Sequence, residues 1–296
     1  MTDIYAASPD RDDIYEIEGG FSVTPHVLFS YAYHRQWAED GRMAVSAREG
    51  CKLILDSGAF SAFRGRVDPI SLEDHTAFVE QHGHRFEFCA ALDVIGNPYK
   101  TLENYEWQRT RVPVVPTFHC GAPLTVLAAY LDSGTTRLAL GGLANGAIHQ
   151  NVKHQFCTQA FNVICDEDGV PRLPVHGFGM VSGRLLVDFP WSTTDGALGA
   201  YMAARRSVSV RRGADIDNVY FRGEDVQTET GRSINMAGPE GAVLLERCAR
   251  HGYQWPDVVE FSSYQMAFSI REMRDGASLV TERFKRHPNA IGSLLF

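Results

Sequence analysis

The sequence predicts an α/β fold, a (β/α)8 TIM-type barrel with an elaborated C-terminal part. Three observations predict it. Short, nearly continuous apolar runs recur along the chain, segments with helical features separate them, and almost every run ends on an aspartate, a histidine or a glycine. Apolar runs without alternation are typical of parallel strands that helices cover on one face and a core on the other.

Seven apolar runs are candidate strands, in series with helices as a barrel requires. These strands are residues 26–33, 51–56, 86–94, 113–119, 137–142, 174–180 and 184–189. Helical periodicity or helix-start signals mark residues 68–83, 97–110 and 122–134, and Gly134 is placed to end the third helix.

The ends of the chain are harder to interpret. Residues 1–20 are expected to be an N-terminal extension, and residues 200–250 an insertion that contacts nucleic acid. Within residues 214–296 we expect a hairpin at 219–231, an amphipathic helix at 238–252 that ends at Gly252, and a final strand and helix at 257–276. No repeat or linker is evident, so residues 1–296 are interpreted as one domain.

Composition limits the functional class. The chain has 296 residues, 44% of them hydrophobic, which is enough for a full core, and a net charge of -8 excludes a surface that is basic throughout. No run of eighteen apolar residues is present and the start, "MTDIYAASPDRDD", is acidic, so neither a membrane span nor a signal peptide is expected. The six cysteines form no C-x-x-C pair, as in proteins of a reducing compartment. A cytoplasmic location is the expectation.

Polar residues at the strand ends predict a ligand site at the barrel mouth, because the carboxyl ends of parallel strands meet there. The expected site residues at these ends are Asp56, Asp93, His119, Gly141, Gly142, His176, Gly177 and Asp188. A single aspartate in such a place can instead cap the following helix or turn the chain. The ordered series favours a site.

These residues also carry a family resemblance. The motifs "DSGAF", "ALDVIG", "LALGGLAN" and "HGFG" resemble those of the tRNA-guanine transglycosylase superfamily, and "DSGAFSAF", "LDVIGNP", "VPTFHCG" and "VHGFG" are similar to its shorter DpdA-like branch of phages and bacterial genomic islands. The resemblance spans residues 26–195. It implies a (β/α)8 enzyme that exchanges guanine in DNA for a 7-deazaguanine base, with the 7-cyano form suggested, in the host cytoplasm if the gene is a phage's.

The resemblance assigns roles to three carboxylates. Asp188 is the expected nucleophile, which traps the sugar covalently as in a retaining glycosidase, and Asp195 is the second possibility. For Asp188 the alternative is a helix cap or an ion pair with Arg184 or Arg205. Asp56 would transfer protons, and Asp93 would accept from the N1–H and 2-amino group of guanine.

Further residues are expected around the base. His119 would donate to the guanine carbonyl, unless it is a packed structural residue. Gly141 and Gly142 would let the backbone approach the base, with His176 and Gly177 at the next strand end. Ser57, Gly58 and Phe60 belong to the turn beside Asp56, where Phe60 either stacks on the base or packs in the core.

A nucleic-acid contact is expected after the strand series. The stretch "YMAARRSVSVRRG" contains two arginine pairs in an otherwise acidic protein, and these four residues would bind phosphates: Arg205, Arg206, Arg211 and Arg212. The alternative is a solvated turn. Trp191 would stack on a base beside the flipped nucleotide, or pack in the core.

No cofactor and no structural zinc are expected, because the chain lacks the C-x-C-x-x-C run of the tRNA enzymes. The alternative metal site combines Cys157 and Cys165 with His149 or His154. The expected partners are DNA, or tRNA as the alternative polymer, and a 7-deazaguanine base, with a partner protein or a second copy left open. The rival interpretation is a barrel hydrolase of a small sugar or nucleoside, in which Asp56 and Asp93 are the acid and base, or a non-catalytic barrel.

Overall fold

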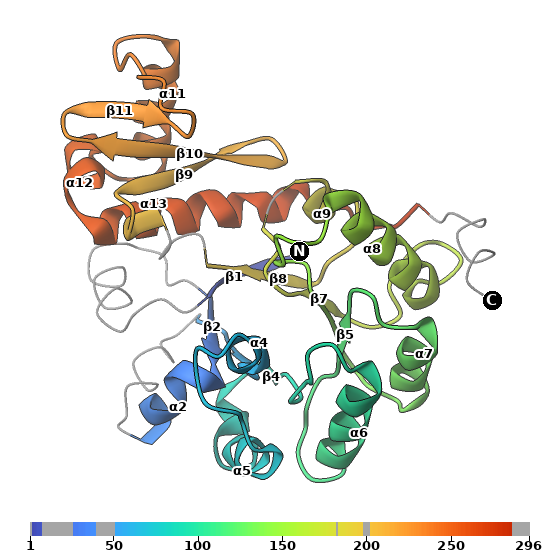
Figure 1. Ribbon diagram of the computed structural model, residues 1–296. Coiled ribbons are helices and arrows are strands. Elements are labelled where there is room, and N and C mark those ends of the chain that lie inside the picture. The colour runs from blue at the N-terminus through green and yellow to red at the C-terminus, as the bar shows by residue number, and fades with distance from the viewer. Residues whose placement is uncertain (1, 8–25, 40–50, 182, 198–201, 286–296) are drawn as a thin grey trace.

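The computed structural model describes residues 2–7, 26–39, 51–181, 183–197 and 202–285. Its centre is an eight-stranded parallel sheet that curls, with helices around its outer face (Figure 1). A smaller unit of one three-stranded antiparallel sheet and three helices lies beside it, at the top left of the figure. The fold is therefore α/β and compatible with a TIM-type barrel.

The elements follow the chain as strands alternating with helices. The parallel strands are β1 (Asp3–Ala7), β2 (His26–Ser30), β3 (Leu53–Asp56), β4 (Phe88–Cys89), β5 (Thr117–His119), β6 (Leu138–Gly141), β7 (Val175–Gly177) and β8 (Thr193–Gly196). The helices around them are α2 (Tyr31–Glu39), α4 (Ala59–Phe63), α5 (Leu72–His82), α6 (Pro98–Arg109), α7 (Leu124–Asp132), α8 (Gln150–Ile164) and α9 (Arg184–Val187), with a 3-10 turn η1 (Gly83–Arg85).

The strand order is β4-β3-β2-β1-β8-β7-β6-β5. The first strand therefore pairs with both the second and the eighth, with Tyr5 opposite His26 on one side and Asp195 on the other. The edge strands β4 and β5 are joined by one isolated parallel bridge, between Ala90 and Val115, so no continuous ladder closes the curl. This order places the carboxyl ends of distant segments around one opening.

The inner face of the curled sheet is filled by side chains from six segments. This inner cluster consists of Tyr5, Leu28, Ile54, Phe88, Val115 and Ala139. Successive residues of a strand point to opposite faces, so the residue two positions after a member of this cluster also faces inward. The inward positions nearest the carboxyl ends are therefore those that can form a site at the mouth.

Helix signals in the sequence are confirmed. The Ser71 side chain accepts from the amide of Asp74 at the start of α5, and Asn97 caps α6 in the same way through Lys100, directly before Pro98. Helix α7 ends as expected before Gly134, which has a φ of 77°.

The strand predicted at residues 184–189 is wrong. This apolar run forms α9 and its end, because Leu185 and Leu186 pack with α8 in the helix layer. The eighth strand is "TTDG", which is polar apart from its glycine and so lacks the apolar run that marked the others. The N-terminal extension is also corrected, since Asp3–Ala7 is a buried strand in the middle of the sheet.

The C-terminal unit is built around its own apolar cluster. It contains β9 (Ser207–Arg212), β10 (Asp215–Arg222), β11 (Asp225–Thr228), α11 (Pro239–His251), α12 (Trp255–Glu260), α13 (Ser262–Arg274) and a 3-10 turn η2 (Asp275–Leu279). The predicted hairpin and the helix that ends at Gly252 are confirmed. The predicted strand within residues 257–276 is wrong, because α12 and α13 occupy that segment.

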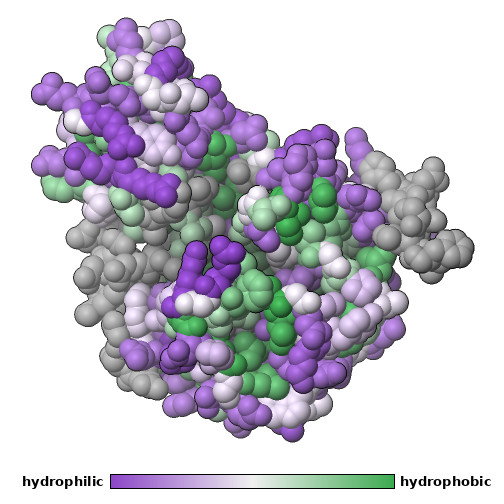
Figure 2. Space-filling view, viewed as in Figure 1, coloured by the Kyte–Doolittle hydropathy of each residue, from purple (hydrophilic) through white to green (hydrophobic). Residues whose placement is uncertain are grey.

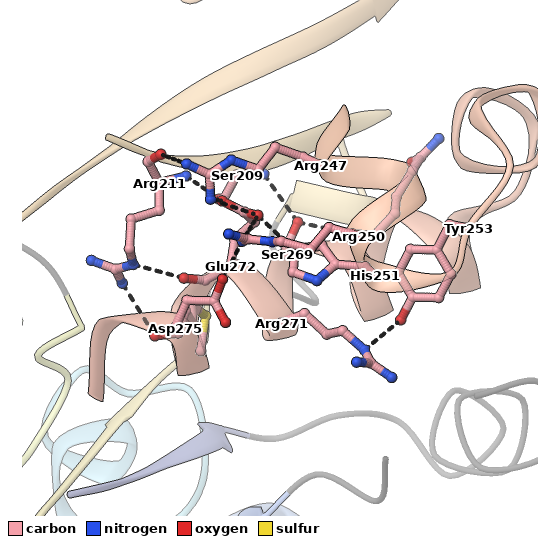
Figure 3. Close-up of polar contacts among 12 residues, drawn as sticks. Ser209, Arg211, Arg247, Arg250, His251, Tyr253, Ser269, Arg271, Glu272 and Asp275 are labelled. Carbon is pink, nitrogen blue, oxygen red and sulfur yellow. Dashed lines mark hydrogen bonds and ion pairs between the residues drawn. The ribbon is translucent and has the colours of Figure 1, made fainter. Parts of the chain in front are cut away.

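A buried carboxylate joins α13 to β9 (Figure 3). Glu272 has no solvent exposure and accepts a hydrogen bond of 2.6 Å from the backbone amide of Arg211, while His251 Nε2 lies 2.7 Å from its other oxygen. The Arg211 guanidinium donates to the backbone carbonyl of Glu272 and, at 2.9 Å, to that of Val181, which follows β7 of the parallel sheet. Arg211 thereby connects the two units.

We predict that Glu272→Gln lowers the free energy of unfolding by about 3–5 kcal/mol, because it leaves the buried His251 and the buried amide of Arg211 without their carboxylate. Although burial opposes ionisation, His251, the Arg211 amide and Arg247 hold the pKa of Glu272 below its usual range. The lost stability should therefore be largest near neutral pH and shrink as pH falls through that low pKa.

Urea titrations at several pH values would measure this loss, with Glu240→Gln as the control. Glu240 pairs with Arg232 on the surface, so its change should leave unfolding almost unaltered. Equal effects of the two substitutions would contradict the anchoring role of Glu272.

Candidate functional site

Three aspartates come together at the carboxyl ends of the parallel strands. Asp56 is the last residue of β3, Asp93 follows β4, and Asp195 is the third residue of β8. The side chains of Asp93 and Asp195 are only 10% and 8% exposed. Both carboxylates act electrostatically on Asp56, so the three lie in one site.

Strand alternation explains why these side chains face inward. Ile54 belongs to the inner cluster, and Asp56 is two residues further along the same strand. On β8, Thr193 Oγ1 lies 2.8 Å from Nδ1 of the buried His176, and Asp195 is again two residues on. The ring of His176 packs against Phe88 of the inner cluster, which places this whole row inside the curl.

Asp93 is held as a carboxylate by two neighbours. Ser57 Oγ donates to its Oδ1 at 2.6 Å, and His119 Nε2 lies 2.7 Å from its Oδ2. Burial alone would raise the pKa of Asp93, but the contacts with His119 and Ser57 outweigh it and lower the pKa. A negative charge is thus fixed in the site, as base recognition by Asp93 would require.

Asp56 has the opposite behaviour. Burial, and then the negative charges of Asp93 and Asp195, raise its pKa to about 7, against the opposing effect of the Gly58 amide, which donates to Asp56 Oδ2 at 3.0 Å. Gly58 has a φ of 78° and a Cβ there would lie 2.5 Å from that of Ala32, so only glycine fits this turn. Asp56 can therefore take up and release a proton near neutral pH.

Asp195 is oriented from two sides. The backbone amide of Gly179 donates to its Oδ1 at 2.8 Å, and His176 Nε2 lies 3.3 Å from the same oxygen. Sequence reasoning did not single out Gly179. The signal in the sequence was the second glycine of "HGFG". Only glycine fits there, because Gly179 has a φ of 67° and a Cβ would lie 2.4 Å from the Cβ of Ala144.

Two more glycines shape the mouth. A Cβ on Gly141 would lie 2.7 Å from the ring of His119, so this glycine leaves the space that the imidazole occupies beside Asp93. Gly142 follows with a φ of 83°. Gly177 instead packs closely on Trp191, since a Cβ there would lie 3.1 Å from its indole. A cavity of about 730 Å³ begins beside Gly179 and extends along α8.

Asp188 does not lie at a strand end, contrary to the sequence prediction. It ends α9 in the helix layer, where His154 Nε2 and Arg184 Nε lie 3.0 and 3.3 Å from its Oδ2. It lines a separate cavity of about 400 Å³ with Phe284. The structure thus contains the ion pair with Arg184 that was the alternative for Asp188. Asp195 is the carboxylate that lies with Asp56 and Asp93.

Two expected nucleic-acid contacts are buried. Trp191 is 3% exposed and its Nε1 donates to the carbonyl of Leu185, so it is a core residue. Arg211 is 4% exposed and belongs to the contacts around Glu272. Arg205, Arg206 and Arg212 are exposed, with Arg212 paired to Asp217. Phe60, at the start of α4, is 47% exposed, which excludes the core-packing alternative.

The alternative cysteine metal site is not assembled. Cys157 and Cys165 are buried in the apolar cluster of the helix layer, where burial raises the pKa of the Cys157 thiol and disfavours the thiolate a metal needs. His149 instead caps α8, and His154 pairs with Asp188. Among the described residues, donor atoms of His251, Glu272 and Asp275 lie within 4.8 Å of one another (Figure 3), but Arg247 and Arg250 already pair with Glu272.

Comparison with protein-family models finds no match for this chain, and comparison with curated proteins finds none. In the part of the chain that the structure describes, none of the helices combines the length and the apolar character needed to cross a membrane. The interpretation of the site therefore depends on its own geometry and on the motifs of the sequence.

We predict that Asp195→Asn brings the pKa of Asp56 below the wild-type value of about 7, because it removes one of the two nearby negative charges that raise it. Titration of the aspartate carboxyl carbons by NMR would measure the change. Asp188→Asn is the matched control and should leave Asp56 unaltered. An equal response to both substitutions would contradict the placement of Asp195 beside Asp56.

Proposed function

We propose that this protein is a guanine transglycosylase, which exchanges guanine in DNA for a 7-deazaguanine base through a covalent aspartyl-sugar intermediate on a (β/α)8 barrel. One observation carries the proposal: three aspartates share one mouth, one fixed as an anion, one with a pKa of about 7 and one oriented by a backbone amide. Base exchange at an intact sugar needs these three roles.

Asp195 is the proposed nucleophile. Its carboxylate attacks C1′ from the face opposite the base, the bond between C1′ and the base nitrogen breaks, and its electron pair leaves with guanine. The hydrogen bond from Gly179 directs Oδ1, so the other oxygen is available for attack. Asp195 was the second possibility for this role from sequence, and its inclusion in the cluster supports it over Asp188.

Asp56 is the proposed acid and base. In its neutral form it donates the proton that the departing guanine needs, and as the carboxylate it then accepts a proton from the incoming base. The incoming nitrogen attacks C1′ and expels Asp195, which restores both carboxyl groups. A pKa of about 7 suits a group that must be protonated in one half of the cycle and ionised in the other.

Asp93 is the proposed base-recognition residue. An ionised carboxylate has about four lone-pair directions; Ser57 donates to one of them on Oδ1, and the His119 ring lies beside Oδ2. Two of the remaining directions can accept from the N1–H and 2-amino group of guanine. A 7-deazaguanine retains both donors, so the same pocket suits the leaving and the entering base.

Two findings bear on the polymer and the base. The chain is similar in its motifs to the DNA-modifying branch, which supports DNA over tRNA, and that branch suggests 7-cyano-7-deazaguanine. We propose that the backbone of Gly141 and Gly142, at the end of β6, contacts the 7-substituent of the base. The same resemblance supports a cytoplasmic setting, that of the host if the gene is a phage's.

We predict that purified protein incorporates 7-cyano-7-deazaguanine into guanine-containing DNA, and that Asp195→Asn lowers the rate at least about a thousandfold. Asp188→Asn is the matched control and should stay within about twofold, because a half-exposed ion pair contributes little. Nucleoside analysis by mass spectrometry, with tRNA in a parallel reaction, measures the product.

Each outcome of that experiment is informative. Loss of exchange in Asp188→Asn but not in Asp195→Asn would return the nucleophile to Asp188. Incorporation into tRNA alone would keep the chemistry and overturn the DNA substrate. Release of free base without replacement would indicate a hydrolase instead.

We predict that kcat/KM falls as pH rises through about 7, because Asp56 must be protonated to release guanine and is ionised above that value. Asp56→Asn should lower the rate about a hundredfold or more and remove this limb from the profile. Initial rates between pH 5.5 and 9 would show it. A limb that persists in Asp56→Asn would assign the titration to another group.

A further inference from the structure

An exposed set of aromatic and basic side chains borders the mouth. We call it the α4–α6 rim, and it consists of Phe60, Phe63, Arg64, Arg66, Tyr99 and Lys100. Its three aromatic residues are 47%, 63% and 59% exposed. Large aromatic side chains at such exposure lose apolar contact with the core, so their placement on the two helices that follow Asp56 and Asp93 indicates a binding role.

The rim lies at the mouth because of where its helices begin. Helix α4 starts three residues after Asp56, and α6 starts five residues after Asp93, so both extend outward from the carboxylate cluster. Figure 1 shows α4 at the opening of the curled sheet, between β2 and β4, and Figure 2 shows hydrophilic and apolar residues side by side on the surface over it.

A cleft of about 530 Å³ lies between these two helices. Phe63 and Lys100 line its sides, Asp93 is one of its lining residues, and most of the remainder are apolar. The cleft is therefore continuous with the residue that is proposed to recognise the exchanged base. Its size is within the range of small-ligand sites, and its apolar walls with a few polar groups suit the faces and edge of a nucleobase.

The charge of the rim points to a polyanion. Arg64 and Arg66 are exposed, and within the described part of the chain neither side chain has a hydrogen bond or an ion pair. Lys100, by contrast, pairs with Glu103 of its own helix, Arg212 pairs with Asp217, and Arg211 is buried against Glu272. In a chain of net charge -8, two unpaired guanidiniums beside exposed aromatics are the combination that binds a phosphate backbone and its bases.

We infer that the α4–α6 rim binds the single-stranded DNA next to the exchanged nucleotide. Phe63 at the cleft, and Tyr99 next to the cleft residue Lys100, stack on unpaired neighbouring bases, and Arg64 and Arg66 bind the adjoining phosphates. The choice of DNA rests on the proposed function; the recognition of phosphate and bases rests on the rim itself.

The test is fluorescence anisotropy with a labelled single-stranded DNA of about 12 nucleotides, over a series of salt concentrations. The double variant R64Q/R66Q should bind about tenfold more weakly at low salt, and the slope of log affinity against log salt should fall by about 1.4, as expected for two lost phosphate contacts. F63A/Y99A should also bind about tenfold more weakly, with the salt slope unchanged.

R109Q/R111Q is the matched control. It removes the same charge from the other end of α6, where Arg109 pairs with Glu106 and Arg111 lies over Trp107, so it should leave the affinity and the slope as in the wild-type protein. Thermal melting of each variant checks that a weaker interaction does not come from unfolding, since all four rim positions are exposed.

The inference is overturned if the wild-type protein does not bind the DNA, if the rim variants bind like the control, or if only an RNA of the same sequence shows the dependence. Its failure is distinguishable from that of the proposed function. If the protein exchanges bases but the rim variants bind DNA like the wild-type protein, only the role of the rim is refuted. If binding depends on the rim but no base is exchanged, only the transglycosylase proposal is refuted.

Discussion

Repulsion among Asp56, Asp93 and Asp195 is the constraint on which the site depends. Three carboxylates that share one partly buried mouth cannot all be ionised unless donors surround them. The structure distributes the donors unequally. Asp93 lies beside Ser57 and His119, and Asp195 lies beside the Gly179 amide and His176. The groups that lower the pKa of Asp56 are instead the Gly58 amide and the Ser30 hydroxyl, and neither is a histidine. The proton therefore resides on Asp56, and this inequality separates the chemical roles of otherwise identical side chains.

The order of the sheet makes that cluster possible. Asp56 and Asp195 are far apart in the chain, and they approach only because β1 pairs with β2 on one side and β8 on the other. The inner cluster below them, with Tyr5 and Ile54, excludes water from the floor of the mouth. The burial that raises the pKa of Asp56 is thus a property of the whole curl, and no single loop could produce it.

Sequence reasoning located Asp56, Asp93 and His119 because apolar runs precede them, and a buried strand imposes its alternation on the residues that follow. It misplaced Asp188 for the same reason, because "RLLV" is as apolar as a strand but forms one helical turn. The true eighth strand, "TTDG", is polar because its inner positions belong to the site. Strand β1 was missed because a five-residue segment near the terminus has too little pattern. The pairing of Asp93 with His119 was also beyond sequence, because it needs the neighbouring positions of β4 and β5.

The second arginine pair shows that neighbouring identical residues can have different roles in the fold. Arg211 and Arg212 are adjacent, so on a strand they point to opposite sides. One became the buried anchor to Glu272 and the other a surface residue. The anchor reaches the carbonyl of Val181, two residues after the Gly179 that orients Asp195, and the side chain of Val181 lies where a Cβ on Gly196 would be. The C-terminal unit therefore supports the segment that positions Asp195, which explains why one of these arginines is buried in the interior rather than exposed to a phosphate backbone.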